Sequence, residues 1–507
     1  MDRRKAITAM AASGFAALPA VLSANGKEPA AKKSTPIIYA SETGAKLDAD
    51  VLLGGGTDDT APLQAVLDSA LETGGIYLVM DGAARITGLT LHANTTIACL
   101  NDSCGFFLSA QSNCAIVSNK HWVFSGERKD NNITLIGGTY NHNCKDQEHH
   151  VAKSSEQATF SFGDDKWVFG IEFYGVENLN IQNIIIRDQR TFALVIANWR
   201  YVNMENIRID LDHYLWAQNQ DGIHAFGPGE FLTIKNITGN SGDDFIALAP
   251  DEWDHVSSIR NVVIDGVFLN GADQGIRLLS RAKGRLDQVT IKNVMGSYKS
   301  FGFYIDHWFD GDGGDYGSIT IDHVNLKQLE PNYHYTKPFL FRIAGKFENL
   351  TLKNIILQHP MDGRSMIDVG WPEPDDNHKF SSTYVKSLVV DGVQVLDDLS
   401  NDAETSYIKI NTMVDRLIIR NIEVLRSEEK KGNGQFIDVY KDADIKTLFM
   451  YNVYLNSIRS LICNRGTVGL LKLNNVLGEN MSGAFIREEG GGISQIEQHA
   501  LSGADLR

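Results

Sequence analysis

Short runs in which apolar and polar residues alternate fill most of this chain, from residue 76 to the C-terminal end. Such alternation is typical of β-strands with one buried face. The runs share one pattern: apolar, any, apolar, any, Asn/Gly/His, apolar. The fifth position of this pattern recurs at intervals of 23 to 38 residues, at Asn183, Asn206, Asn236, Gly266, Asn293, His323, Asn354, Gly392, Asn421, Asn452 and Asn475.

A repeat of this length with two or three short strands and no helix predicts a solenoid of stacked β-coils. We therefore expect an all-β, single-domain, right-handed parallel β-helix with coils of about 29 residues. A β-propeller is less favoured, because its blades need four strands and a longer repeat. The recurring Asn fits a sharp turn in the left-handed conformation.

One segment ahead of the repeats has a helical pattern. It opens with the capping sequence Thr57-Asp58-Asp59-Thr60, carries Pro62 in its first turn and stops at Gly74-Gly75. Its apolar positions are Leu63, Val66, Leu67, Ala70 and Leu71. We expect an N-terminal helix that caps the open end of the β-helix core.

The N-terminal end resembles an export signal. Asp2-Arg3-Arg4-Lys5 precedes an Ala/Gly-rich stretch, and Leu22-Ser23-Ala24 offers a cleavage site. We expect a signal peptide over 1–24, with the twin-arginine and general secretory routes both open, a linker over 25–35 and a catalytic β-helix over 36–507. The product is expected in the periplasm or outside a bacterial cell. A segment at 143–165 interrupts the repeat and is expected to be a solvated loop carrying His149 and His150.

Composition narrows the set of partners. The formal net charge of −16 argues against nucleic acid and anionic membranes as partners. The five cysteines, which show neither CxxC nor metal-ligand spacing, are expected to be free thiols: Cys99, Cys104, Cys114, Cys144 and Cys463. We expect a monomer with no cofactor and no metal.

Three aspartates at a one-coil spacing are the main candidates for chemistry. Asn219-Gln220-Asp221-Gly222 is followed, 22 residues after Asp221, by Gly242-Asp243-Asp244. Residues one coil apart lie side by side on a β-helix, about 4.8 Å apart. The three carboxyl groups should therefore meet at one turn and raise one another's pKa, which favours a functional role over a structural one.

These two motifs resemble the first two signature motifs of glycoside hydrolase family 28, the polygalacturonase family of pectin-lyase-like parallel β-helices. The resemblance implies that Asp243 is the general acid and that Asp221 and Asp244 activate water. Inversion requires an acid and a base about 6.5–9.5 Å apart, which neighbouring coils can provide. The expected activity is hydrolysis of a pectin-like or other polysaccharide, with a carbohydrate as the only partner.

The next two coils depart from the family. Gln274 stands near the histidine of the Gly-His-Gly motif, and Gly302-Phe303-Tyr304-Ile305 replaces the Arg-Ile-Lys uronate clamp. An anionic substrate is therefore in question. The remaining candidate substrate-binding residues are Asn219, His224, Arg277, Tyr304, His307 and Trp308.

Each of these candidates has a plainer alternative. His224 is expected to orient a carboxylate. Arg277 either contacts ligand or pairs with acids, and Tyr304 and Trp308 either stack on sugar or pack under a loop. Asp251, Glu252 and Asp306 are expected on the solvated surface.

Three other functions stay open on this fold: polysaccharide lyase, uronate epimerase and non-catalytic carbohydrate binding. A calcium site also competes for the three aspartates.

Overall fold

The computed structural model describes residues 35–148, 150–151, 160–162, 165–213, 219–307, 313–330, 338–358, 365–370, 383–397, 406–426 and 434–507. The expected signal peptide and most of the linker, together with His149 and Trp308, lie outside the described residues. Thr35–Arg507 form one compact unit.

The N-terminal half of this unit contains two helices and two short 3-10 helices among its strands. In chain order they are β1 (Ile37–Tyr39), η1 (Ala40–Glu42), α2 (Thr60–Asp68), α3 (Ala70–Thr73), β2 (Ile76–Met80), β3 (Ala83–Ile86), β4 (Leu89–Leu91), β5 (Thr95–Cys99), β6 (Gly105–Leu108), β7 (Val117–Asn119), β8 (Asp130–Ile136), β9 (Thr139–Asn141), η2 (Cys144–Asp146), β10 (His150–Val151), β11 (Phe160–Phe162), β12 (Asp165–Trp167), β13 (Ile171–Gln182), β14 (Ile185–Arg187), β15 (Leu194–Asp210), β16 (Ile223–Phe226), β17 (Gly229–Gly239) and β18 (Asp244–Ala249).

The described C-terminal half consists of strands. They are β19 (Ile259–Leu279), β20 (Arg285–Asp306), β21 (Asp315–Gln328), β22 (Phe339–Ile343), β23 (Lys346–Gln358), β24 (Ile367–Val369), β25 (Tyr384–Asp397), β26 (Ser406–Ile410), β27 (Met413–Arg426), β28 (Gln435–Val439), β29 (Asp444–Asn456), β30 (Ser460–Asn464), β31 (Thr467–Glu479), β32 (Ile486–Glu488) and β33 (Gly492–Ser502).

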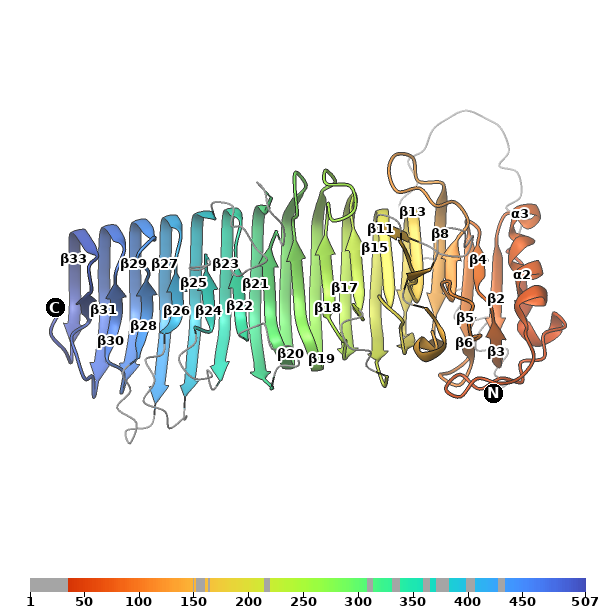
Figure 1. The fold of residues 1–507 in the computed structure, drawn as a ribbon, viewed down its shortest axis with the longest axis horizontal. Coiled ribbons are helices and arrows are strands. Elements are labelled where there is room, and N and C mark those ends of the chain that lie inside the picture. The colour runs from red at the N-terminus through yellow and green to blue at the C-terminus, as the bar shows by residue number, and fades with distance from the viewer. Residues whose placement is uncertain are drawn as a thin grey trace, which may run out of the picture. The chain divides into compact units, whose positions relative to one another are not determined.

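Strands of successive coils pair in parallel, which confirms the mostly β, parallel β-helix prediction. β15 pairs with β17, β17 with β19 and β19 with β20, each in parallel register. Figure 1 shows this stack of parallel strands running from the first coils to the last. The right-handed sense of the solenoid stays a prediction.

The predicted turn residues adopt the conformation that the repeat pattern requires. All eleven fifth-position residues have a positive φ, from 49° at Asn354 to 81° at Gly266. Asn tolerates this left-handed region better than other residues that carry a Cβ. Side-chain amides then form a ladder between coils: Asn206 Nδ2 donates to Asn183 Oδ1 at 2.9 Å, and Asn236 Nδ2 donates to Asn206 Oδ1 at 3.1 Å.

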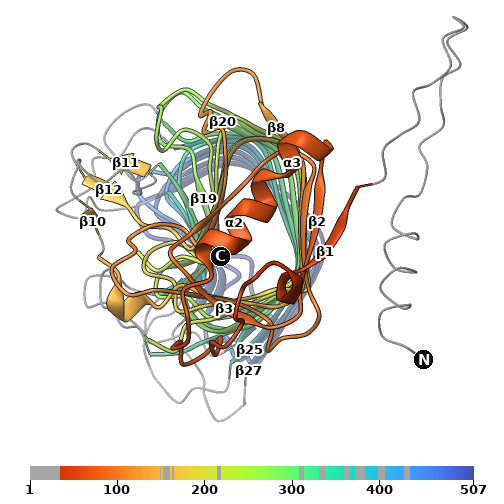
Figure 2. The ribbon, with the colours of Figure 1, turned by 90° about the vertical axis from the view of Figure 1, so that its right-hand side faces the viewer.

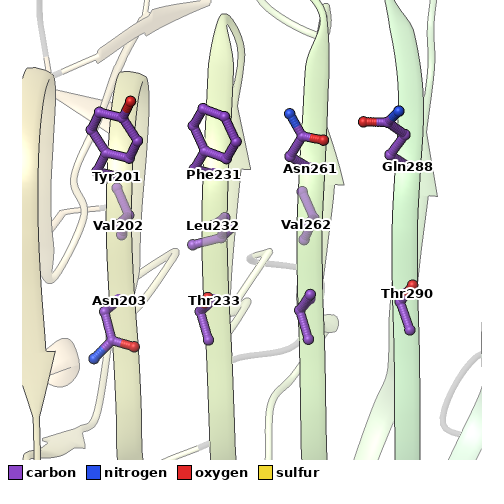
Figure 3. A pocket seen from close by; sticks show the side chains of 11 residues that line it. Tyr201, Val202, Asn203, Phe231, Leu232, Thr233, Asn261, Val262, Gln288 and Thr290 are labelled. Atoms are coloured by element: carbon purple, nitrogen blue, oxygen red, sulfur yellow. The ribbon is translucent and has the colours of Figure 1, made fainter.

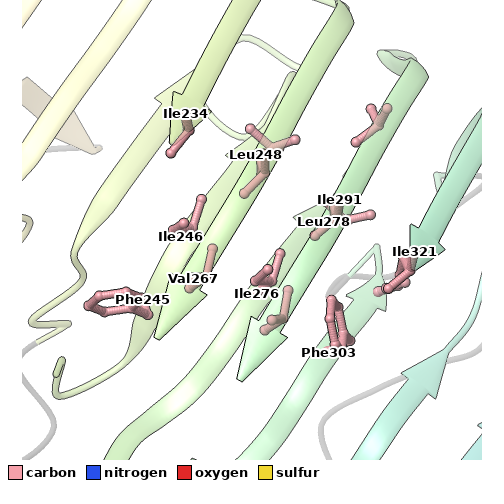
Figure 4. Close-up of a cluster of buried hydrophobic side chains, with 14 of the residues drawn as sticks. Ile234, Phe245, Ile246, Leu248, Val267, Ile276, Leu278, Ile291, Phe303 and Ile321 are labelled. Carbon is pink, nitrogen blue, oxygen red and sulfur yellow. The ribbon is translucent and has the colours of Figure 1, made fainter. Parts of the chain in front are cut away.

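The interior of the coils is filled by one row of apolar side chains above another. Ile223, Ile246, Ile276, Phe303 and Phe341 are partners in successive registers and are fully buried. Figure 4 shows part of this row among its neighbours. Full burial of such a side chain contributes about 1.5–3 kcal/mol, so each coil is stabilised mainly by the coils beside it.

The predicted N-terminal helix is present as α2 and α3, and it ends at Gly74 with φ 80°. Leu63 and Leu67 are buried in the main hydrophobic core, whereas Leu71 is exposed. Figure 2 shows α2 lying across the end of the solenoid. Within the predicted capping sequence, Asp58 Oδ1 accepts the N–H of Thr60, the first residue of α2, at 2.9 Å, whereas the Asp59 carboxylate accepts the backbone N–H groups of Lys46 and Leu47.

The described parts of the segment at 143–165, which was predicted to be a loop, include secondary structure. They contain η2, and β10 and β11 each pair antiparallel with β12 in a small separate sheet. The cysteine prediction is confirmed: all five are free, and four of them are buried. Among the described residues, no helix has the length and apolar character needed to cross a membrane.

Candidate active site

The three predicted aspartates lie where two successive coils begin their strands. Asp221 stands two residues before β16, and Asp243 and Asp244 stand at the start of β18. The Gly222 N–H donates to the Asp244 carbonyl at 2.9 Å, so the two segments lie side by side. Asp244 is in turn in register with Gln274 on β19. The one-coil spacing therefore brings four predicted site residues to one turn of the solenoid.

Two amides hold the Asp243 carboxylate. Gln274 Nε2 donates to Asp243 Oδ1 at 2.5 Å, and Asn219 Nδ2 donates to Asp243 Oδ2 at 3.3 Å. Asn219 itself has a positive φ of 47°. Gln274 thus orients the Asp243 carboxylate from the position at which the family pattern has histidine. The Asp243 and Asp244 residues are only partly buried, which leaves this edge of the cluster open to a ligand.

A histidine joins Asp221 to a second acid that the sequence placed on the surface. His224 Nδ1 contacts Asp221 Oδ2 at 2.8 Å, and His224 Nε2 contacts Glu252 Oε2 at 3.0 Å. The ring of Phe192 stacks on the imidazole with centroids 4.4 Å apart and planes 3° apart. His224 is therefore fixed on both nitrogens and on one face, as the predicted orienting role requires.

The ionisation of this group follows from burial and pairing. Burial opposes protonation of His224, but its bonds to Asp221 and Glu252 raise its pKa to about 10. Burial also opposes ionisation of Glu252, yet the bond to His224 and nearby cations lower its pKa. His224, which is buried, and Glu252, which is partly buried, thus form an ion pair in neutral solution.

The three aspartates keep protons to higher pH than ordinary carboxyl groups. Burial raises the pKa of Asp243 to about 6 and that of Asp221 to about 8. Burial, followed by the charges of Asp243 and Asp221, raises the pKa of Asp244 as well. Because such close groups titrate as a set, the cluster as a whole holds at least one proton in mildly acidic solution.

Arg277 forms an ion pair with Asp306, and its charge also lowers the pKa values of Asp243 and Asp244 against the effect of burial. Its Nη2 lies 2.5 Å from Asp306 Oδ1, and both side chains are almost completely buried. The guanidinium also lies over the Tyr304 ring, 3.7 Å from its centroid. Tyr304 stacks in turn on Phe301 with centroids 4.2 Å apart. Of the alternatives open for Arg277 and Tyr304, the structure favours ion pairing for the first and packing for the second.

The surface prediction for three further carboxylates is wrong. Asp306 is the buried partner of Arg277, and Glu252 is the partner of His224. Asp251 is buried and accepts the backbone N–H groups of Arg281, Ala282 and Gly284 at 2.6 to 2.8 Å. Alternation within one strand did not reveal them, because their partners come from neighbouring coils. The predicted binding residue His307 is also buried.

Sequence reasoning also missed Asp273. This residue is fully buried, and burial together with the charge of Asp243 raises its pKa to about 8. It lies beside Gln274, one coil after Asp243, so the spacing that identified Asp243 offered the signal. Asp273 is a fourth carboxyl group that disfavours full ionisation of the cluster.

A separate open groove of about 550 Å³ lies on the outer surface of β15, β17, β19 and β20. Figure 3 shows Tyr201, Phe231, Asn261 and Gln288 at the same height on four successive strands of this groove. The Tyr201 and Phe231 rings are 5.1 Å apart with planes 9° apart. None of the aspartates of the candidate site lines this groove.

Comparisons with known proteins place this geometry in context. No family model matches the chain. A family 28 exopolygalacturonase of Yersinia enterocolitica has the same fold, with a TM-score of 0.55, 13% identity and coverage of 82% of this chain and 78% of that one. The A-module of mannuronan C-5 epimerase AlgE4 of Azotobacter vinelandii matches with a TM-score of 0.50, 12% identity and coverage of 81% and 100%.

One curated relative matches by sequence. It is a protein of Neosartorya fischeri that carries the name galacturan 1,4-alpha-galacturonidase C, and it is 25% identical over 131 residues. The match takes in 24% of this chain and about a third, 31%, of the relative's length. The resemblance to family 28 is thus confirmed at the level of the fold, with low sequence identity.

Proposed function

We propose that this chain is a glycoside hydrolase that cleaves a pectin-like polysaccharide. The observation that carries the proposal is the cluster of three aspartates at one turn, whose raised pKa values keep a proton available in mildly acidic solution. The names of the Yersinia and Neosartorya proteins support a substrate of the pectin type. A carbohydrate-binding protein without activity has no need for such a costly group of acids.

In the proposed reaction, Asp243 donates its proton to the oxygen of the leaving sugar. Its two amide partners, Asn219 and Gln274, fix the direction of the carboxyl group. Asp221 and Asp244 hold the attacking water on the other side of the sugar ring, and the product then has inverted anomeric configuration. Asp221 Oδ1 and Asp244 Oδ1 have no hydrogen-bond partner within the described part of the chain, so each offers an acceptor to that water.

His224 and Glu252 are proposed as positioning residues. The bond from His224 to Asp221 Oδ2 leaves Oδ1, a buried oxygen with no hydrogen-bond partner among the described residues, as the acceptor for the attacking water. The imidazolium of His224 opposes the effect of burial on the pKa of Asp221, and the charge of Arg277 and the bond from Gln274 do the same for Asp243. The choice of Asp243 as the acid and Asp221 as the base therefore rests on the place of each residue in the two motifs, since the aspartates titrate as a set.

The proposal predicts a bell-shaped dependence of kcat/KM on pH with its maximum on the acid side of neutrality. The basic limb appears as the aspartates, which titrate as a set, lose the last proton that Asp243 can donate. The acidic limb appears when the last carboxylate of the cluster is protonated.

The test is a product analysis on a panel of polysaccharides: polygalacturonate, its methyl ester, alginate and neutral galactans. New reducing ends without an unsaturated uronate support the proposal. Unsaturated products indicate a lyase, and a change at C-5 without chain cleavage indicates an epimerase, the alternative that the likeness to the AlgE4 module keeps in view. Both outcomes refute hydrolysis. Cleavage of the methyl ester would show that this chain, which lacks the Arg-Ile-Lys clamp, does not require a charged uronate.

We also propose export and a monomeric state. The Arg3-Arg4 sequence ahead of an Ala/Gly-rich stretch supports a signal peptide over 1–24. Cell fractionation with the Arg3→Lys, Arg4→Lys double variant tests the twin-arginine route, and light scattering of the purified protein tests the monomer. If the double variant is exported as well as the wild type, the result favours the general secretory route.

A further inference from the structure

A second group of chemically active side chains lies on the coils just before the aspartates. Cys144 opens η2, Asp188 follows β14, and His213 follows β15. One donor atom from each, a sulfur, a carboxylate oxygen and a ring nitrogen, lies within 4.8 Å of the other two. The residues are 44 and 25 positions apart in the chain, so no short metal-binding motif marks them in the sequence.

Backbone bonds hold these residues in place. Asp188 Oδ1 accepts the N–H groups of Asp212 and His213, both at 3.0 Å, which turns Asp188 Oδ2 toward His213 Nδ1, also at 3.0 Å. The Cys144 N–H donates to the Asp188 carbonyl at 3.0 Å. These bonds hold the Asp188 carboxylate beside the thiol and the imidazole.

We propose that Cys144, Asp188 and His213 bind one Zn²⁺ ion. A thiolate, an imidazole and a carboxylate together suit zinc, whereas calcium and magnesium take oxygen ligands only. The donors of a tetrahedral zinc site lie about 3.3–3.6 Å apart, given its usual bond lengths. A small movement of the His213 side chain reaches this geometry, because that side chain is 40% exposed. The same exposure gives the ion a path of entry and leaves its fourth position to water.

The Cys144 thiol lies beside His213, because its Sγ donates to the His213 carbonyl at 3.6 Å. Zinc binds the thiolate, so binding should release about one proton per ion near neutral pH. Arg190, two residues after Asp188, donates its Nε to the Gln147 carbonyl at 2.7 Å.

The proposed ion sits at the base of the segment that carries Asp221. Gln220 Nε2 donates to the His213 carbonyl at 3.2 Å and to the Gln189 carbonyl at 2.8 Å. Gln189 Nε2 donates to the Asp221 carbonyl at 3.1 Å. Zinc would therefore fix both chain segments that position this aspartate. The role is structural, and it stands whether or not the chain proves to be a hydrolase.

Metal binding to the purified full chain, first freed of metal with a chelator, tests the proposal without any substrate. Calorimetric titration with Zn²⁺ is expected to give one ion per chain and, in buffers of different ionisation enthalpy, release of about one proton. Co²⁺ is expected to give a thiolate-to-cobalt charge-transfer band. Zn²⁺ should also raise the Tm, because it binds the folded chain.

Variants locate the site. Cys144→Ser and His213→Gln should each weaken Zn²⁺ binding by roughly a hundredfold or more, since even outer partners of metal ligands are worth 10–100-fold. Two controls should bind as the wild type does. Cys463→Ser removes another buried thiol, and His323→Gln removes another histidine paired with an aspartate, Asp322, at 2.8 Å.

His213→Gln keeps the test decisive if Cys144→Ser does not fold, because His213 is partly exposed. Three results would each overturn the proposal. They are no binding of Zn²⁺ by the wild type, a Co²⁺ complex without the charge-transfer band, and binding by His213→Gln as tight as that of His323→Gln.

Discussion

Replacing Glu252 by Gln removes one of the two carboxylates that hold His224, while keeping a group of the same shape. The amide still accepts a hydrogen bond from Nε2, but without the charge. Hydrogen bonds to charged groups contribute about 1.5–3 kcal/mol and neutral ones about 0.5–1.5 kcal/mol. We therefore expect Glu252→Gln to lower the free energy of unfolding by about 1–2 kcal/mol at pH 6.

The pH dependence identifies the cause. The pKa of His224 is raised to about 10 in the folded chain, so its pairing stabilises the fold fully below the ordinary value of about 6.5 and is lost as the pH rises through about 10. For the wild type this loss is on the order of 3 kcal/mol between pH 6.5 and pH 9. The pKa of Glu252 is lowered, so the stability that its ionised form contributes is lost as the pH falls through that lowered value. The difference in free energy of unfolding between Glu252→Gln and the wild type should therefore keep its whole value from pH 6 to 8 and vanish above pH 10.

Urea denaturation at pH 6, 8 and 10.5 measures this difference. Glu497→Gln is the matched control, because Glu497 pairs with Lys472 at 2.9 Å where both side chains are 44% exposed. Such surface pairs contribute about 0–1 kcal/mol, and the control should show no change between pH 6 and 8. A Glu252→Gln variant as stable as the wild type at pH 6, or equally destabilised at pH 6 and 10.5, would show that His224 and Glu252 are not an ion pair.

Three further variants test other parts of the account. Asp243→Asn should lower kcat by about 10²–10⁴ while the fold stays intact, since the amide keeps one of its two hydrogen bonds, and initial rates above a tenth of wild type would contradict its role as acid. Arg277→Ala leaves Asp306 buried without its partner, so thermal denaturation should show a loss of about 3–5 kcal/mol in the free energy of unfolding. The loss should be smaller in the Arg277→Ala, Asp306→Asn double variant, and equal losses in the two variants would contradict the pairing. Asn236→Ala should lower the free energy of unfolding by about 1–2 kcal/mol, because Ala does not favour the positive φ and cannot donate to Asn206. Asn236→Gly should lower it less, because Gly tolerates this φ, as Gly266 does at the same position one coil later. Urea midpoints in the opposite order would contradict the turn assignment.

The repeat was predictable from the sequence because its signal is local and periodic. Each coil repeats the same apolar alternation and the same left-handed turn, so Asn183 and Asn475 could be assigned from their immediate neighbours. The convergence of Asp221 with Asp243 and Asp244 was predictable for the same reason, since parallel register turns a one-coil spacing into proximity.

The partners of the site were not predictable in the same way. Glu252 is 28 residues from His224, and Asp306 is 29 residues from Arg277. Neither pair joins register partners, because His224 is opposite Ala247 and Arg277 is opposite Tyr304, so the repeat alone does not reveal the two pairs. A charged residue near a turn looks like a surface residue unless its partner is known. For this reason Asp251, Glu252 and Asp306 were assigned to the surface and Asp273 was overlooked.

The anomeric form of the first product tests the central claim most directly. The assay is proton NMR during the first minutes of the reaction, on the polysaccharide that gives new reducing ends. At this stage mutarotation has not yet equilibrated the two anomers, so the spectrum reports the configuration of the first product. The account predicts an inverted anomer for the wild type and no signal from Asp243→Asn at the same enzyme concentration. Retention of configuration, or an unsaturated sugar in place of a new reducing end, would contradict the assignment of Asp221, Asp243 and Asp244 as the residues of an inverting hydrolase.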